Sequence, residues 1–226
     1  MGGQRFNLRN TKSTNIKIAL IAGMVFFIYG VLFTGGEEMA QDTRFSKKEI
    51  GLRVGTIAPD FTGETYRGNA VRLSDLYRNG PVVLIFYRGA WCPYCNLHLR
   101  AFQQRFNDFK ALGATILVVS VDKPEYSTKT VQDDALGFEV ISDPGTEILE
   151  KYNVIYHVSD ELAEKYLNEY KIDLEKHSGR KDHVIAIPAT YVIDKTGKIV
   201  FGYANEDYKV RTEPQEILNF LENMNK

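Results

Sequence analysis

Two runs of apolar residues mark the centre of the chain. Residues 82–87 are apolar throughout, and residues 115–121 are apolar at almost every position. Runs of this length without alternation predict strands that are buried on both faces. Between them, Phe102, Phe106 and Phe109 recur at spacings of four and three, which is typical of one face of a helix. Strand, helix and strand in this order predict a βαβ unit with a parallel sheet.

Weaker patterns predict shorter elements on both sides of this unit. Residues 155–186 look like an insertion, in which residues 160–170 have a helical composition and residues 176–183 are polar and loop-like. The other expected elements are an extended segment over 55–61, a short strand over 70–73, a helical turn over 74–77, helices over 124–136, 147–152 and 214–224, a short strand over 138–141, and a hairpin of strands 189–193 and 198–203. The predicted fold class is therefore α/β, with a central mixed sheet flanked by helices.

The N-terminal part of the chain differs from the rest. Residues 1–15 are polar and basic, residues 16–34 contain an apolar segment, and residues 35–54 form a mixed polar linker. Residues 18–34 are uncharged over 17 positions, at the short limit of the about 17–25 residues that span a membrane. We therefore expect a transmembrane anchor or signal segment ahead of one domain over residues 55–226.

The charges around this apolar segment predict its orientation. Lys17 stands before it, and Glu37, Glu38 and Asp42 follow it, which favours a cytoplasmic N-terminus. The domain would then be membrane-anchored and extracytoplasmic, in the periplasm. Cleavage of the segment as a signal peptide, which would leave a secreted or periplasmic protein, and a buried soluble helix are the alternatives.

Composition narrows the class of chemistry. The net charge of −1 implies no nucleic-acid partner, and the 44% hydrophobic fraction is enough for a packed core. The chain has only two cysteines, Cys92 and Cys95, and both lie in one motif. A scaffold stapled by disulfides would distribute several pairs along the chain, so a single close pair points to redox or metal chemistry.

The two cysteines stand where the first buried strand ends and the helix begins. The unpaired N–H groups and partial positive charge of a helix N-terminus favour a thiolate over a thiol. Pro93 fits the first helical position, and Cys92 and Cys95 lie one turn apart, close enough to form a reversible disulfide. Arg88 is expected to stabilise a thiolate, with a plain surface charge as the alternative. Trp91 is expected to form a lid, a docking surface or a packing contact.

Two other uses of the cysteine pair remain open at this stage. An inert disulfide across one helical turn would stabilise the fold only weakly. Metal binding would use Cys92, Cys95 and His98, or would recruit His183 as in copper-delivery proteins on related folds. Zinc would need a fourth ligand that the sequence does not place, and Asn96 replaces the histidine that haem attachment requires. We therefore expect no cofactor and no metal.

Four motifs in order carry a resemblance over about residues 50–222. They are Gly55-x-x-Ala58-Pro59-Asp60-Phe61, Phe86-Tyr87-Arg88-Gly89-x-Trp91-Cys92-Pro93-Tyr94-Cys95, Ser142-Asp143-Pro144, and Pro188-Ala189-Thr190-Tyr191-Val192-Ile193-Asp194 followed by Gly197. This set resembles the thioredoxin superfamily, and within it the peroxiredoxin-like group of the alkyl hydroperoxide reductase/thiol-specific antioxidant family. The resemblance implies a thioredoxin-like fold.

The site departs from the pattern of ordinary peroxiredoxins. Cys95 falls on the position of the peroxide-attacking cysteine, while Cys92 stands where that family has threonine and Arg88 where it has proline. The later arginine that helps to bind peroxide is replaced by Pro188. Thioredoxins have a cis-proline facing their Cys-x-x-Cys pair, and Pro188 is expected to take that role.

The resemblance implies a thiol-based oxidoreductase whose catalytic residues are Cys92 and Cys95. We expect it to reduce hydroperoxides at the expense of a thioredoxin-like or other dithiol donor, more slowly than standard peroxiredoxins. A membrane-tethered reductase of protein disulfides is the alternative, and a copper-binding chaperone is the third. Which cysteine attacks first is left open.

Overall fold

The computed structural model of the chain describes residues 50–224. These residues lie in the second of two units, residues 45–226. The expected membrane segment over residues 18–34, the basic segment and most of the linker fall outside the described part. No helix within residues 50–224 is long and apolar enough to cross a membrane.

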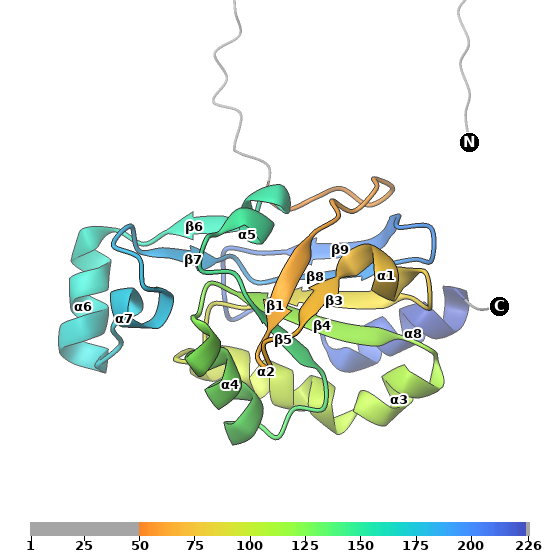
Figure 1. Cartoon of the computed structure of the whole chain (residues 1–226), viewed down its shortest axis with the longest axis horizontal. Helices are drawn as coiled ribbons and strands as arrows, with labels where there is room; N and C mark the ends of the chain where they lie inside the picture. Colours follow the sequence, from red (N-terminus) through yellow and green to blue (C-terminus); the bar gives the residue numbers. More distant parts are fainter. Residues whose placement is uncertain (1–49, 225–226) are drawn as a thin grey trace, which may run out of the picture. The chain divides into compact units, whose positions relative to one another are not determined.

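A seven-stranded mixed sheet forms the centre of the domain, in the order β2-β1-β5-β4-β3-β8-β9 (Figure 1). Strands β3, β4 and β5 are parallel to one another, which confirms the predicted βαβ unit, and β3–β8 and β8–β9 pair antiparallel. The strands are β1 (Thr62–Thr65), β2 (Ala70–Arg72), β3 (Val82–Phe86), β4 (Thr115–Ser120), β5 (Glu139–Ser142), β8 (Ala189–Ile193) and β9 (Ile199–Ala204).

Strand β3 shows why its sequence is apolar at every position. Val82, Leu84 and Phe86 pack into one hydrophobic cluster, while Val83 and Ile85 pack into another on the opposite face. Successive side chains of a strand point to opposite faces, so a strand covered on both sides needs no polar positions. Each such buried side chain contributes about 1.5–3 kcal/mol of transfer free energy.

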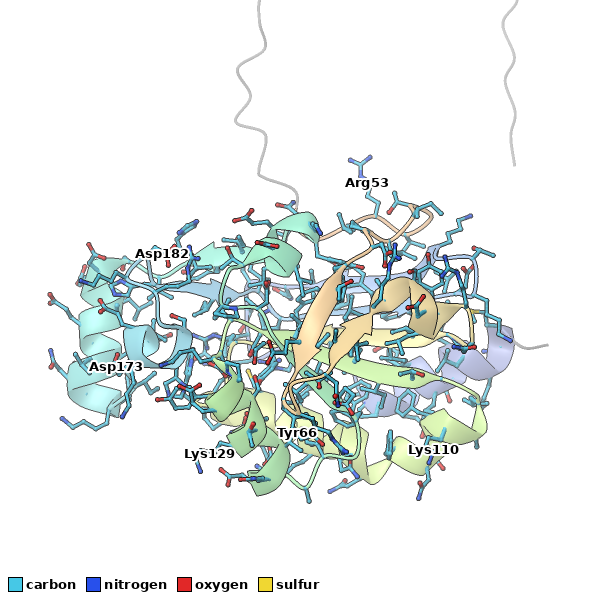
Figure 2. The ribbon with its side chains drawn as sticks, viewed as in Figure 1. Arg53, Tyr66, Lys110, Lys129, Asp173 and Asp182 are labelled. Carbon is cyan, nitrogen blue, oxygen red and sulfur yellow. The ribbon has the colours of Figure 1, made fainter. Side chains whose placement is uncertain are left out.

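Helices cover both faces of the sheet. One cluster takes side chains from α2 (Pro93–Gln104), α3 (Phe106–Ala111), α4 (Pro124–Asp133) and α8 (Pro214–Met224), and the other from α1 (Leu73–Tyr77) and α5 (Glu147–Lys151). Figure 1 shows the two groups on opposite sides of the sheet. Figure 2 shows Lys110 of α3 and Lys129 of α4 pointing away from it, so the charged faces of these helices meet solvent.

The helix that follows the cysteines is divided in two. At Arg105 the backbone angles are φ −106° and ψ 10°, and α2 ends there. The break allows Phe102 and Phe109 to stack in the core with ring centroids 5.4 Å apart, while Phe106 meets Phe138 at the edge. The predicted aromatic face is therefore present, but on two helices.

The insertion forms a small substructure at one end of the domain (Figure 1). Strands β6 (Ile155–His157) and β7 (Val184–Ala186) pair antiparallel. Helices α6 (Asp160–Tyr170) and α7 (Leu174–Ser178) lie between these strands in the sequence. Helix α6 matches the predicted bounds. The predicted loop over residues 176–183 is wrong at its start, because Asp173 caps α7 by accepting a hydrogen bond from the Lys176 N–H.

Candidate active site

Cys92 and Cys95 stand at the start of α2, as the sequence predicts. Cys92 is the N-cap residue, Pro93 occupies the first helical position, and the N–H groups of Cys95 and Asn96 donate to the Cys92 carbonyl. Both cysteines are free thiols in this structure, with 1% and 0% of their surface exposed. Burial leaves little room for solvent at either sulfur, so any substrate must reach them through an adjoining pocket.

The two thiols differ in acidity. A hydrogen bond with the Cys95 side chain lowers the pKa of Cys92 to about 6, helped by the Cys95 N–H and the charge of Arg88 against the opposing effect of burial. Burial raises the pKa of Cys95 well above its usual range, and the hydrogen bond with Cys92 and the negative charge of that residue add to this rise. At neutral pH the pair therefore holds a thiolate at Cys92 and a thiol at Cys95.

The loop between β3 and α2 is held in place by a buried carboxylate. Asp122 accepts a hydrogen bond of 2.6 Å from the Ala90 N–H, and the Asn96 side chain donates to the Ala90 carbonyl. Gly89 has φ +147°, and a Cβ there would lie 2.5 Å from Trp91 Nε1. His177 of the insertion lies 3.6 Å from the second carboxylate oxygen of Asp122. The insertion is therefore close to the carboxylate that holds this loop.

An arginine that the sequence analysis did not single out lies beside the buried sulfur. Arg211 Nη2 donates to Cys95 Sγ over 3.3 Å, and its Nε donates to the Tyr208 carbonyl. Its Nη1 is buried with no hydrogen-bond partner among residues 50–224. Arg211 thus supplies a positive charge next to Cys95, although no arginine occupies the position of Pro188. No motif or periodic pattern around Arg211 indicates a role in the site, since it lies in the segment three residues before the start of α8.

His98 supports the segment that carries Arg211. Its Nε2 lies 2.8 Å from the Thr212 carbonyl, and burial lowers the pKa of His98 to about 4, so the neutral ring donates from Nε2. His183 contacts Asp160 and Glu175 within the insertion. Neither of these two histidines joins the cysteines in a group of potential metal ligands, and residues 50–224 contain no such group of three or more.

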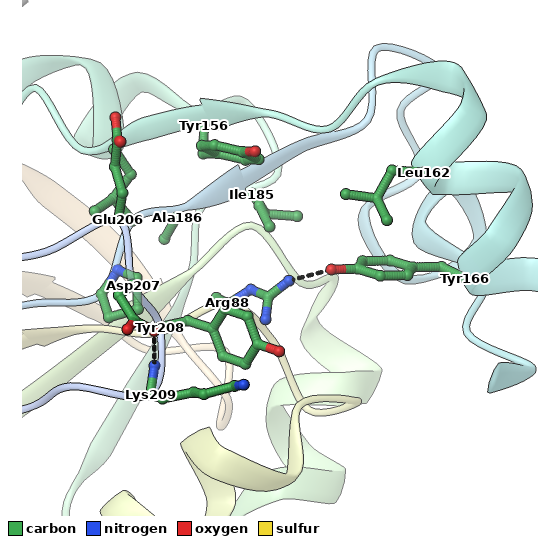
Figure 3. Close-up of a pocket in the computed structure, with 12 residues that line it drawn as sticks. Arg88, Tyr156, Leu162, Tyr166, Ile185, Ala186, Glu206, Asp207, Tyr208 and Lys209 are labelled. Atoms are coloured by element: carbon green, nitrogen blue, oxygen red, sulfur yellow. Dashed lines mark hydrogen bonds between the residues drawn. The ribbon is translucent and has the colours of Figure 1, made fainter.

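Arg88 lies between aromatic rings. Its guanidinium carbon is 4.8 Å from the Trp91 ring centroid and 4.2 Å from that of Tyr208, and Nη2 donates to the Tyr166 hydroxyl over 2.7 Å (Figure 3). Arg88 is buried, with 6% of its surface exposed. The sequence analysis expected Arg88 beside the thiols but assigned no role to Tyr166, because the spacing of α6 does not reveal what it packs against.

Two pockets meet at Arg88. The first, which we call the thiol pocket, has a volume of about 480 Å³ and is lined by Cys92, Trp91, Pro93 and the insertion residues Lys165 and Tyr170, among others. The second, the neighbouring pocket of about 280 Å³, is lined by Pro188 and β7. Both are lined by Arg88, Leu162, Tyr166 and Tyr208. The thiol pocket falls in the size range of small-molecule sites, about 300–1,000 Å³.

The expectation of a cis bond at Pro188 is wrong. Residues 50–224 contain no cis peptide bond. Ile187 and Pro188 join β7 to β8 without forming a turn, and the trans bond continues the extended chain between the strands. Pro188 lines the neighbouring pocket with Arg88 and is not among the residues that line the thiol pocket.

Comparisons with known proteins identify the family of this chain. The model of the AhpC/TSA family matches residues 54–201. The thiol-disulfide oxidoreductase ResA of Geobacillus kaustophilus is 31% identical over 142 residues, which is 62% of this chain and 73% of ResA. Peroxiredoxin Bcp of Escherichia coli is 25% identical over 170 residues, 75% of this chain and 96% of Bcp.

Solved structures share the fold at lower identity. The crystal structure of peroxidoxin BcpB from Mycobacterium tuberculosis superposes with a TM-score of 0.61 at 19% identity, covering 78% of this chain and 99% of BcpB. A cysteine-to-serine mutant of Xylella fastidiosa PrxQ gives a TM-score of 0.61 at 18% identity, covering 79% of this chain and 100% of PrxQ. The chain therefore belongs to the AhpC/TSA family and is a peroxiredoxin-like thiol peroxidase or thiol-disulfide oxidoreductase.

Proposed function

We propose that this protein reduces hydroperoxides through a dithiol–disulfide cycle in which Cys92 attacks and Cys95 resolves. The observation that carries the proposal is the difference between the two thiols. Cys92 has a pKa lowered to about 6 and lines the thiol pocket, whereas Cys95 has a raised pKa and no exposed surface. The thiolate is the nucleophilic form of cysteine, so the acidic, pocket-lining residue is the better attacker.

The proposed dithiol–disulfide cycle has three steps. The Cys92 thiolate attacks one oxygen of R–O–O–H, the O–O bond breaks, and Cys92 becomes a sulfenic acid while R–O⁻ takes up a proton to leave as the alcohol. Cys95 then loses its proton and attacks the sulfenic sulfur, so that an S–S bond forms and water leaves. An external dithiol of the thioredoxin type reduces this disulfide and is itself oxidised.

Two charges favour individual steps of this cycle. Arg88 stabilises the Cys92 thiolate before attack. Arg211, 3.3 Å from Cys95 Sγ, stabilises the Cys95 thiolate that the second step requires, and its unpartnered Nη1 is a donor close to the reacting sulfurs. The family's peroxide-attacking position corresponds to Cys95, so the proposal reverses the usual roles.

Single-turnover oxidation of two variants tests this order of attack. With Cys95→Ser, we expect one equivalent of hydroperoxide to be consumed and a sulfenic acid to be trapped at Cys92 by dimedone. With Cys92→Ser, consumption should fall at least about tenfold, because the Cys95 thiol is protonated and buried. Loss of reactivity only in Cys95→Ser would instead assign attack to Cys95 and contradict the proposal.

Reduction of protein disulfides is the second candidate. An acidic first cysteine and a buried second one also suit a Cys-x-x-Cys reductase, and ResA is named as a thiol-disulfide oxidoreductase. The two activities separate by substrate: insulin reduction without hydroperoxide consumption would favour the disulfide reductase. Membrane anchoring is proposed from the apolar pattern of residues 18–34, and carbonate extraction of membranes tests it. The extracytoplasmic side is proposed from the charges that flank this segment.

A further inference from the structure

We infer that the thiol pocket is built for a small amphipathic substrate that carries an anionic group, and that Arg88 binds this group as a specificity-determining residue. The inference deepens the proposed function, because it names the class of hydroperoxide: one with a carboxylate on an apolar body. It rests on three features of the pocket, which are a buried arginine that no carboxylate pairs, the absence of lining carboxylates and the position of Cys92.

Arg88 is a buried cation that no carboxylate of the described residues pairs, although its charge also acts on the Cys92 thiolate. No carboxylate of residues 50–224 forms an ion pair with it, and its one side-chain hydrogen bond runs from Nη2 to the Tyr166 hydroxyl. Burying a charge is costly unless it is paired and hydrogen-bonded. The rings of Trp91 and Tyr208 compensate part of this cost, and an anion bound in the pocket would compensate more.

The remaining donors of Arg88 are available to a ligand. Its Nε and Nη1 make no hydrogen bond to residues 50–224 and are not fully buried. Because Arg88 lines both pockets, these two nitrogens are accessible to a ligand there. Figure 3 shows the guanidinium between Tyr166 and Tyr208, with its hydrogen bond to the Tyr166 hydroxyl. A planar guanidinium presents parallel N–H groups that match a carboxylate, which a lysine ammonium cannot do.

The charges around the pocket favour an anion. The thiol pocket is lined by Arg88 and Lys165 and by no aspartate or glutamate. Lys165 lies 3.9 Å from Glu169, so Arg88 is the cation that no carboxylate pairs, and the negative group that lines the pocket is the Cys92 thiolate. Glu206 and Asp207 line the neighbouring pocket but not the thiol pocket, and Figure 3 shows the Glu206 carboxylate directed away from Arg88. Asp207 is engaged by the Lys209 N–H. A negative group is therefore attracted to the thiol-pocket side of Arg88.

The rest of the pocket suits an apolar body that reaches Cys92. Leu162, Tyr166 and Ile172 contribute apolar surface from the insertion, and Trp91 contributes it from the loop before α2. Cys92 lines this same pocket. A ligand held by its carboxylate at Arg88 can therefore place a hydroperoxide on its apolar body at the sulfur. Hydrogen peroxide alone would use none of this surface.

Trp91 provides a direct probe of binding, because it is the only tryptophan of the chain and lies 4.8 Å from Arg88. We would titrate the reduced protein with 4-isopropylbenzoate and with its uncharged amide, 4-isopropylbenzamide, and follow Trp91 fluorescence. A charge-assisted hydrogen-bonded pair predicts roughly tenfold or more tighter binding of the carboxylate. Equal binding of the two probes, or no binding of either, would overturn the inference.

Variants assign the preference to one cation. Arg88→Met should remove the difference between the two probes, Arg88→Lys should retain part of it, and Lys165→Met, the matched control in the same pocket, should retain most of it. Loss of the preference in Lys165→Met but not in Arg88→Met would overturn the assignment. If Arg88→Met fails to fold, Tyr166→Phe and the salt dependence of wild-type binding replace it, with weaker carboxylate binding expected in both.

Turnover separates this inference from the proposed function. We would compare cumene hydroperoxide with its para-carboxylate and take the ratio of kcat/KM values, which cancels changes in Cys92 acidity. The carboxylated substrate should be favoured roughly tenfold or more in the wild type and not in Arg88→Met. Tight carboxylate binding without hydroperoxide consumption would keep the anionic subsite and reject the peroxidase. Consumption of both hydroperoxides at equal rates would keep the peroxidase and reject the anionic subsite.

Discussion

Replacing Cys95 by alanine tests the origin of the acidity of Cys92. The pKa of Cys92 falls from an ordinary 9.0 to about 6, and the hydrogen bond with the Cys95 side chain is the largest cause. The whole difference corresponds to about 4 kcal/mol of preferential stabilisation of the thiolate. One hydrogen bond to a charged group contributes about 1.5–3 kcal/mol of this, so alanine should make the acid dissociation constant of Cys92 about ten- to hundredfold smaller.

Serine at the same position is the matched control. Its hydroxyl donates to the Cys92 thiolate from nearly the same place, so Cys95→Ser should keep most of the acidity that Cys95→Ala loses. The assay is the rate of iodoacetamide alkylation of Cys92 as a function of pH, with the ultraviolet absorbance of the thiolate as a second readout. Each variant retains a single cysteine, so the titration has one origin.

The outcome also bears on function. At pH 7, a pKa of about 6 leaves roughly nine-tenths of Cys92 as thiolate, and a ten- to hundredfold smaller dissociation constant would leave roughly a half to a tenth. If both variants titrate like the wild type, the hydrogen bond is not the cause, and the acidity must come from Arg88 and the start of α2. If both titrate near 9.0, the side chain at position 95 acts by some property that serine does not share.

Gly89→Ala should lower the free energy of unfolding by about 1–3 kcal/mol in urea denaturation, since φ +147° is strained for alanine and the Cβ would lie 2.5 Å from Trp91 Nε1. Gly145→Ala, where the nearest atom is 3.8 Å away, should change it little. Burial holds His98 neutral, with its pKa lowered from 6.5 to about 4, so it binds fewer protons in the folded state. It should therefore cost up to about 3 kcal/mol of stability as the pH falls from 6.5 to 4, and His98→Gln, which still donates, should lack this component of an acid-unfolding profile. Arg211→Gln should slow disulfide formation after oxidation about tenfold in stopped-flow Trp91 fluorescence, because the Cys95 thiolate loses a charge-assisted hydrogen bond; an unchanged rate would show that Arg211 does not act on this step.

Several elements could be predicted from the sequence because their causes are local. The two apolar runs became β3 and β4, and Pro93 after a cysteine marked the start of α2. The bounds predicted for α6 and α8 agree with the structure. In each case the apolar spacing or the capping residue lies within the segment itself, so a window of about ten residues contains the information.

Other elements depended on neighbours that no local pattern describes. Strand β1 has the sequence Thr-Gly-Glu-Thr, which lacks an apolar face, and forms because its backbone pairs with β2 and β5. Helix α7 lies in a polar segment that we predicted as a loop, and the Asp173 cap stabilises its first turn although its composition does not indicate a helix. The trans bond at Pro188 likewise follows from the extended path between β7 and β8, which the motif around the proline does not specify.

The sequence by itself determined that two thiols share one turn at the tip of α2, and its resemblance to the family predicted that their chemistry is redox. Only the tertiary structure decided which charges and rings surround them. Arg88 meets Tyr166 across 78 residues of chain, and Arg211 meets Cys95 across 116. Such contacts arise when the sheet and the insertion pack together. Periodicity and capping record how a segment packs and where it begins, but they do not record which distant segment lies opposite, so the pocket around Cys92 came only from the fold.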